Sequence, residues 1–204
     1  MQRTRRGRPQ EADPREIARI ALDLFEREGF DRVTMDEIAH AASVSRRTLF
    51  RLFPSKWDLV WGSLGDILDV IRQRAAALSG ADLRVGGVLR EFIEPFLRPL
   101  DDPEAAAMAR RRLRVIASAP ALLDHPTLRE IEVVLATTVA AGPSPNGAPP
   151  LLVAHALVAV TIAALMWWAE HGQDTSALEA TRAAFRALAQ ADEPDPPASP
   201  PTTR

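Results

Sequence analysis

The chain has 204 residues, of which 47% are hydrophobic and 25% are charged, a composition typical of folded globular proteins rather than disordered ones. It contains no cysteine, which excludes disulfides, thiolate metal sites and thiol nucleophiles. A formal net charge of −2 argues against a protein that binds nucleic acid over its whole surface.

The first predicted helix spans 14–28, where apolar residues recur at intervals of three and four and so share one face. Gly29 follows directly and is a suitable helix end. A second helix is predicted over 34–42. It opens with Thr34 and Glu37, which can form a capping box by satisfying each other's backbone N–H groups.

A third, shorter helix is predicted between Ser45 and Phe53. Ser45 can cap its first turn, and Pro54 ends it because proline disfavours helix in the residue before it. Two short helices joined by a few residues, the second of them basic, are typical of a helix-turn-helix motif. The segment 13–54 is therefore predicted to be a DNA-binding domain.

The remainder of the chain also has helical patterning and gives no sign of strands. A fourth helix is predicted to run without interruption from Ser55 to Ala77. Further helices are expected at 83–99, 103–118, 120–141, 150–171 and 174–190. The prediction is an all-α fold of about nine helices, with a second helical domain over 55–190. Residues 191–204 are rich in proline and are predicted to be a disordered tail.

Positive charge is concentrated in two segments. Residues 1–8 contain four arginines and residues 45–56 contain three arginines and a lysine, with no acidic residue in either. Local basic patches of this kind are typical of phosphate binding, although a solvated charged surface is the alternative. We interpret 1–12 as a flexible basic arm. It lacks the apolar stretch of a secretory signal, so a cytoplasmic location is expected.

The segment 151–169 is almost entirely apolar and is long enough to span a membrane. Pro149 and Pro150 precede it, His155 and Thr161 interrupt it, and no basic cluster flanks it. A helix that is apolar on all sides is also typical of a buried dimer interface. We favour the buried helix and expect no membrane partner, with a membrane-associated regulator that uses this span as the alternative.

At residues 48–56 the chain reads Thr-Leu-Phe-Arg-Leu-Phe-Pro-Ser-Lys, a highly specific run within a longer segment, 33–59, that resembles the TetR repressor family. Residues 21–30 resemble the first helix of the same family. The resemblance covers about the first 60 residues. It implies a three-helix DNA-binding head, a variable ligand-binding domain, here 55–190, and a homodimer formed through the last two helices, about 150–190.

Three positions depart from the family's usual pattern. Ser43 stands where the family has glycine, so the turn must accommodate a non-glycine residue. Phe50 replaces the usual tyrosine, and Leu52 replaces tyrosine or histidine. Fewer phosphate contacts are therefore expected from the third helix, and we expect the arginine-rich arm to compensate for them.

A weaker resemblance extends into the second domain. Residues 53–62 and 111–122, with His125, Leu128 and Arg129, are similar to mycofactocin-type regulators, which respond to long-chain acyl-CoA. This resemblance makes a long-chain acyl-CoA the specific candidate ligand. A broader expectation is a small apolar or amphipathic effector.

The first turn of the third helix is predicted to enter the major groove of double-stranded DNA. Arginine can donate two hydrogen bonds to guanine, so at least one of Arg46 and Arg47 is expected to read a guanine. Thr34 and Lys56 lie at helix N-termini and are expected to bind phosphates, with a simple N-cap as the alternative for Thr34. The arm is expected to enter the minor groove, with a disordered basic tail as the alternative. The predicted DNA-binding residues are Thr34, Ser45, Arg46, Arg47, Thr48, Phe50, Arg51, Lys56, Arg5, Arg6 and Arg8.

A ligand pocket is expected among the apolar residues of the second domain, with membership of a plain hydrophobic core as the alternative for each of them. Its predicted lining residues are Trp61, Leu64, Leu68, Phe92, Phe96, Leu113, Ile116, Val158, Ile162 and Leu165. Four arginines between Arg110 and Arg114 could bind a charged headgroup, but a solvated or ion-paired surface is favoured. Trp167 and Trp168 are expected to be buried near the dimer interface.

An enzymatic activity is not expected. The sequence has no glycine-rich phosphate loop, nucleophile motif or metal-ligand cluster, so we expect neither a cofactor nor a metal. The sequence therefore predicts a repressor that binds a palindromic operator as a homodimer and is released by its ligand. A transcriptional activator is the alternative.

Overall fold

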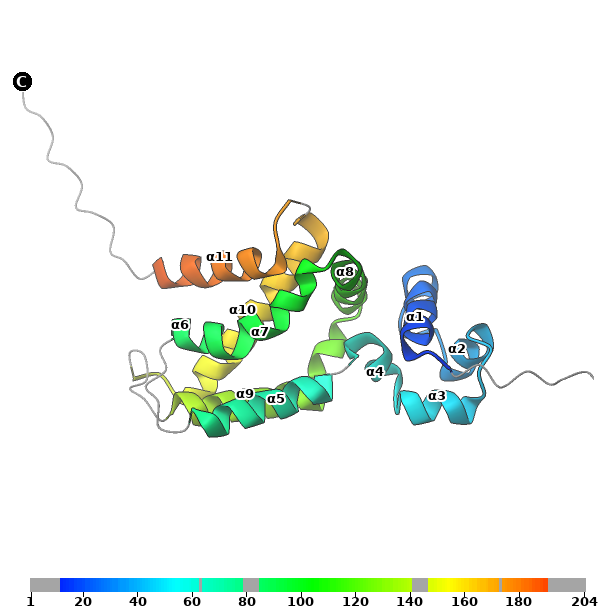
Figure 1. Ribbon diagram of the computed structural model, residues 1–204, viewed down its shortest axis with the longest axis horizontal. Coiled ribbons are helices and arrows are strands. Elements are labelled where there is room, and N and C mark those ends of the chain that lie inside the picture. The colour runs from blue at the N-terminus through cyan, green and yellow to red at the C-terminus, as the bar shows by residue number, and fades with distance from the viewer. Residues whose placement is uncertain (1–11, 63, 79–84, 141–146, 173, 191–204) are drawn as a thin grey trace, which may run out of the picture.

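The computed structural model describes residues 12–62, 64–78, 85–140, 147–172 and 174–190, and the regular structure of these residues is entirely helical (Figure 1). This agrees with the predicted all-α fold. The predicted tail and nearly all of the predicted basic arm, including its arginines, lie outside the described residues.

The first three helices form a small head at one end of the molecule (Figure 1). They are α1 (Pro14–Glu28), α2 (Met35–Ala41) and α3 (Arg46–Leu52), all close to their predicted bounds. Gly29 ends α1 with a φ of 90°, a conformation that glycine adopts at low cost. The turn between α2 and α3 places Ser43 at φ 54°, so this non-glycine residue does occupy the left-handed region.

The prediction of one continuous helix from Ser55 to Ala77 is wrong. The structure has two helices, α4 (Lys56–Trp61) and α5 (Leu64–Ala77). Gly62 ends α4 with a φ of 62°, which is outside the helical region. The sequence gives no sign of this break, because the helical spacing of apolar residues continues from α4 into α5.

Two further predicted helices are divided at prolines. The segment predicted as 83–99 consists of α6 (Val85–Val88), the π-helical η1 (Leu89–Ile93), α7 (Glu94–Leu97) and the 3₁₀ turn η2 (Arg98–Asp101). Pro95 cannot donate the usual helical hydrogen bond, which explains the irregular turns before it. The segment predicted as 120–141 consists of the 3₁₀ turn η3 (Pro120–Asp124) and α9 (Pro126–Val139), with Pro126 at the start of a new helix.

The remaining helices are α8 (Pro103–Ser118), α10 (Pro150–His171) and α11 (Ala177–Gln190). The first two match their predicted ranges, and α11 begins three residues later than expected. Helix α10 packs against α8, α9 and α11, and α8 stands between the head and the other helices (Figure 1). Within the described residues α10 is the one helix long and apolar enough to span a membrane, and 22% of its most apolar stretch is buried inside the chain.

The buried residues form three clusters. The first fills the head but continues through Leu59 and Val60 of α4 to Val115 and Ile116 of α8. The second lies between α5, η1, α9 and α10, and the third packs Trp168 of α10 against the start of α11. The core of the head therefore extends past Pro54, the predicted end of the DNA-binding domain, into α4 and α8.

Candidate functional site

Helix α3 presents its basic side chains to solvent. Arg46, Arg47 and Arg51 are all exposed, while Leu49 on the opposite side is fully buried in the core of the head. The amphipathic pattern explains this orientation, because Leu49 and Phe53 anchor the helix through one face. The structure therefore brings the three predicted arginines together on one exposed surface.

The hydroxyl groups at the start of α3 are occupied by capping. Ser45 Oγ accepts from the backbone N–H of Thr48 at 3.1 Å, and the two side-chain hydroxyls lie 2.8 Å apart. Thr34 plays the same part for α2. Its backbone N–H donates to the Glu37 carboxylate at 2.7 Å and its hydroxyl accepts from the Glu37 backbone N–H at 3.3 Å, which is the predicted capping box. The hydrogen bonds from Thr34 lower the pKa of Glu37.

The Lys56 ammonium is directed at the loop between α1 and α2, and the phosphate contact expected from the position of Lys56 at a helix N-terminus stays a prediction. The ammonium donates to the carbonyl oxygens of Phe30 at 2.6 Å and Val33 at 3.0 Å, with a longer contact of 3.4 Å to that of Asp31. It also lies 4.3 Å from the centre of the Phe30 ring. Burial lowers the pKa of Lys56. Its donors already have partners, so binding a phosphate would require breaking these bonds.

The arginines of α8 are also engaged within the chain. Arg111 reaches from α8 to α1, where it forms hydrogen bonds with both carboxylate oxygens of Glu26 and with Asp23. Arg114 lies 3.8 Å from the same glutamate. Arg110 donates to the carbonyl oxygen of Trp168 at 2.7 Å and stacks over its indole ring at 3.9 Å. Arg111 and Arg114 are therefore ion-paired, as the favoured interpretation expects, whereas Arg110 is held by a backbone carbonyl and an aromatic ring.

Arg112 occupies a different environment from its neighbours. It points to the break between α4 and α5, where a Cβ added to Gly62 would lie 2.8 Å from the Arg112 guanidinium. Its Nε is buried and has no hydrogen-bond partner within the described part of the chain. Burial lowers the pKa of Arg112. Gly62 thus allows both the left-handed turn and the close approach of this side chain.

A cavity of about 170 Å³ lies in the second cluster, enclosed by α5, η1, α7, α9 and α10. Of the ten predicted pocket residues, the structure places seven along it: Trp61, Leu64, Phe92, Phe96, Val158, Ile162 and Leu165. Leu68 is buried in the same cluster without lining the cavity. Leu113 and Ile116 do not line it either, because α8 turns them toward the head core.

Sequence reasoning missed the wall formed by α9. Leu128, Ile131 and Leu135 line the cavity from that helix, and their spacing of three and four residues is the signal that could have identified them. The polar groups in the lining are already bonded. The Thr161 hydroxyl donates to the carbonyl oxygen of Leu157 at 2.7 Å, and the Trp61 indole N–H donates to the carbonyl oxygen of Leu122 at 2.9 Å.

Trp61 connects the cavity with the head. It is the last residue of α4, it lines the cavity, and among the described residues it is the one side chain that packs against both the first and the second cluster. Its hydrogen bond to Leu122 fixes it to the first cluster, and the His125 ring lies 6.4 Å away. A change in the shape of the cavity would therefore act directly on the end of α4.

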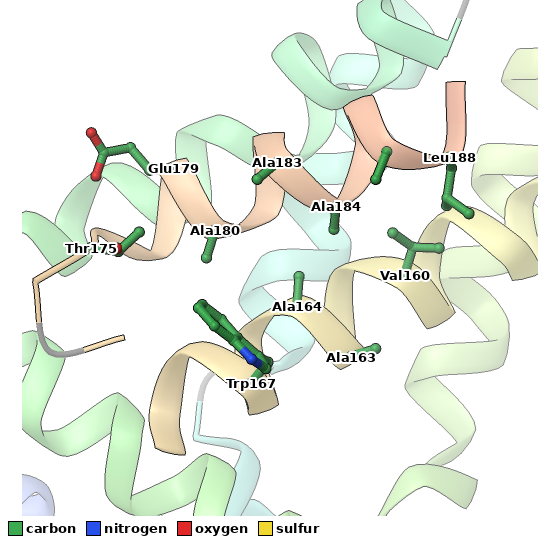
Figure 2. Close-up of a pocket in the computed structure, with 11 residues that line it drawn as sticks. Val160, Ala163, Ala164, Trp167, Thr175, Glu179, Ala180, Ala183, Ala184 and Leu188 are labelled. Atoms are coloured by element: carbon green, nitrogen blue, oxygen red, sulfur yellow. The ribbon is translucent and has the colours of Figure 1, made fainter. Parts of the chain in front are cut away.

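A second depression, an open groove of about 680 Å³, lies between α10 and α11. Figure 2 shows Ala164 and Trp167 from α10 facing Ala180 and Ala184 from α11 across it. Trp167 is 52% exposed, whereas Trp168 is buried within the chain. The predicted burial is confirmed for Trp168, whose ring belongs to the third cluster of this chain, whereas Trp167 is exposed in the single chain. That the two lie near a dimer interface stays a prediction.

Comparison with protein families gives two matches. Residues 17–60 match the family described as bacterial regulatory proteins, tetR family, and residues 89–193 match the family described as MftR C-terminal domain. The first match contains the helix-turn-helix. The second contains the cavity wall formed by η1, α9 and α10, together with the groove between α10 and α11.

Individual proteins show the same relationship. The chain is 31% identical to MftR of Mycobacterium tuberculosis, named as a mycofactocin biosynthesis transcriptional regulator, over 89% of this chain and 92% of that protein. It is 32% identical to the transcriptional regulator RutR of Escherichia coli, over 60% of this chain and 57% of that protein.

Solved structures extend the likeness to the fold. The repressor FadR of Thermus thermophilus, in complex with lauroyl-CoA, is 21% identical and gives a TM-score of 0.52, over 93% of this chain and all of that one. The repressor NalD of Pseudomonas aeruginosa is 18% identical and gives a TM-score of 0.56, over 87% of this chain and 97% of that one. At these identities the likeness concerns the arrangement of the helices.

Proposed function

Because this chain belongs to the TetR family of bacterial regulatory proteins, we propose that it is a homodimeric repressor of transcription that a small ligand releases from its operator. The observation that carries this proposal is the position of Trp61. This residue lines an apolar cavity on one side and packs against the core of a basic helix-turn-helix head on the other.

In the proposed complex α3 enters the major groove of the operator. Its exposed surface carries Arg46, Arg47 and Arg51, and the fork of an arginine matches the O6 and N7 acceptors of guanine. The two heads of the dimer would read half-sites of a palindrome about 34 Å apart. We also propose that the arm, with Arg5, Arg6 and Arg8, follows the minor groove.

The groove between α10 and α11 supports a dimer formed through these helices. Alanines on both sides let another helix approach closely, and the exposed Trp167 and Leu188 offer large apolar side chains to a partner. A second copy would cover the apolar face of α10 that this chain leaves exposed. In a membrane-associated regulator lipid would cover it instead, so recovery of the protein in the cytoplasmic or the membrane fraction separates the two proposals.

We propose an apolar or amphipathic ligand, with a long-chain acyl-CoA as the specific candidate. The cavity supports the apolar part, because its walls are leucine, isoleucine, valine and aromatic side chains. The likeness to MftR and the fold shared with the lauroyl-CoA complex of FadR make an acyl chain the first compound to test.

The release mechanism follows from how Trp61 is placed. A ligand that enters the cavity displaces the indole ring, and the displacement moves α4 because the ring sits at its end. Leu59 and Val60 of the same helix are fully buried in the core of the head, so the head turns with α4. The spacing of the two heads then no longer fits the operator. The free energy of DNA binding that is lost cannot exceed the ligand's preference for the displaced state.

A fluorescence anisotropy titration tests the proposal, with labelled DNA from upstream of the gene, excess competitor DNA and lauroyl-CoA as the probe. Tight, competitor-resistant binding that lauroyl-CoA releases is the expected result. Ile162→Phe, which fills the cavity, should bind the DNA but resist release. Val133→Phe, at an exposed position of α9, is the matched control and should respond like the wild type.

Each other outcome rejects a specific part of the proposal. Binding that lauroyl-CoA leaves unchanged would reject acyl-CoA as the ligand and keep the DNA-binding regulator. A lack of specific binding to the upstream DNA would reject the operator assignment. A reporter gene that falls silent when the regulator is deleted would replace repression by activation.

A further inference from the structure

The two helices of the helix-turn-helix are joined by a charged pair on the exposed side of the head. The Arg46 guanidinium, in the first turn of α3, lies 3.2 Å from one carboxylate oxygen of Asp36 and 3.3 Å from the other. Asp36 lies in the first turn of α2. Both side chains are about two-thirds exposed, so the pair contributes little to the stability of the fold.

The same guanidinium is held from a second direction. It lies 5.4 Å from the centre of the Phe50 ring, one helical turn further along α3. Phe50 is itself 37% exposed, and the stacking gives this ring a role other than contact with the core. Arg47 and Arg51, in contrast, have no side-chain partner within the described residues. The three exposed arginines of α3 therefore differ, because within the described residues only Arg46 has side-chain partners that favour one direction.

We propose that Asp36 is a positioning residue that sets the sequence preference of the head by holding Arg46 in the direction from which it reads a base. The inference rests on the proposed function, since it assumes that α3 binds DNA. An arginine that is already oriented loses less conformational freedom when it forms its two hydrogen bonds to guanine. A base pair that offers no matching acceptors gains nothing from this orientation.

Asp36 also acts on DNA of any sequence. Its carboxylate stands beside the surface that faces the phosphates, and a negative charge there opposes the attraction that supplies non-specific binding. This repulsion weakens the binding of the correct sequence and of all others alike, so it leaves the ratio of specific to non-specific affinity unchanged. Asp36 changes that ratio only through Arg46.

The variant Asp36→Asn tests the proposal, because asparagine keeps the size of the side chain and removes its charge. Wild type and variant are each used to select bound duplexes from a random DNA library. Affinities for the selected site and for unrelated DNA are then measured. We expect the variant to bind unrelated DNA more tightly. The ratio of specific to non-specific affinity should fall by about 2- to 10-fold per head, from the cost of ordering a free arginine.

Two further variants separate a positioning role from a simple change of charge. Glu28→Gln removes one negative charge from the end of α1, where the partner of Glu28 among the described residues is the neighbouring Arg27, and should leave the ratio unchanged. In an Arg46→Ala background Asp36→Asn should no longer affect the ratio, because the residue through which it acts is gone.

The outcomes distinguish this inference from the function on which it rests. If the wild type selects no preferred sequence, the proposed DNA-binding regulator itself is rejected. If the wild type selects a site and Asp36→Asn strengthens specific and non-specific binding by the same factor, only the positioning role is wrong. A drop in the ratio that persists in the Arg46→Ala background would also overturn it.

Discussion

Substitution of Lys56 by methionine should destabilise the protein by about 3 kcal/mol. Methionine keeps most of the aliphatic stem and removes the ammonium. The two short hydrogen bonds to the carbonyl oxygens of Phe30 and Val33 are lost, and so is the contact with the Phe30 ring. Hydrogen bonds from a charged group contribute about 1.5–3 kcal/mol each, and we use the lower value because Lys56 is only half-buried.

Urea unfolding followed by far-ultraviolet circular dichroism measures this loss, with wild type and variant at the same protein concentration because the proposed dimer makes stability concentration-dependent. DNA affinity is then measured at several salt concentrations. If Lys56 binds a phosphate instead, stability should stay within about 0.5 kcal/mol of the wild type. The salt slope should then fall by about 2 for the two lysines of a dimer. That combination would refute the structural role.

Three other experiments test local features of the fold. Because the pKa of Glu37 is lowered in the folded protein, the stabilisation by its carboxylate is present above pH 4.5 and is lost as the pH falls below that value. In urea unfolding, the wild type and Glu37→Gln should therefore differ in stability near neutral pH and become equal in acid. Ser43→Gly should raise the unfolding free energy by about 0.5 kcal/mol, because relief of the left-handed strain exceeds the added chain entropy; a loss of stability would contradict this. A double-mutant cycle of Arg111→Gln and Glu26→Gln should give a coupling energy of about 1 kcal/mol, and additive effects would show that the pair does not hold α1 on α8.

Local signals were sufficient for the parts of the fold that depend on neighbouring residues. The capping box of Thr34 and Glu37 placed the start of α2, and Gly29 placed the end of α1. The break at Gly62 was not predicted, because the apolar stripe gives no sign of it and the reason for it is partly tertiary. Its left-handed turn allows Arg112, fifty residues later, to pack against it.

The candidate site residues also fall into two groups, those whose position follows from neighbouring residues and those whose position depends on tertiary contacts. The exposure of Arg46 and Arg47 follows from the amphipathic pattern of α3 alone. Lys56 could not be placed from its position at a helix start, because its partners are carbonyl oxygens more than twenty residues earlier. Leu113 and Ile116 were assigned to the pocket by their apolar character, which does not say whether α8 turns them to the cavity or to the head.

The continuation of the head core into α8 limits how this protein can be recombined with its relatives. A chimera that joins residues up to Pro54 to another regulator's ligand-binding domain would leave Leu49 and Phe53 without the α4 and α8 side chains that complete their cluster. Moving the junction to Gly62 would restore Leu59 and Val60 but not the α8 surface. The head can therefore be transferred only to a regulator whose helix equivalent to α8 packs against the core of the head as α8 does here. The head and the ligand-binding domain of this chain therefore cannot be exchanged independently of each other.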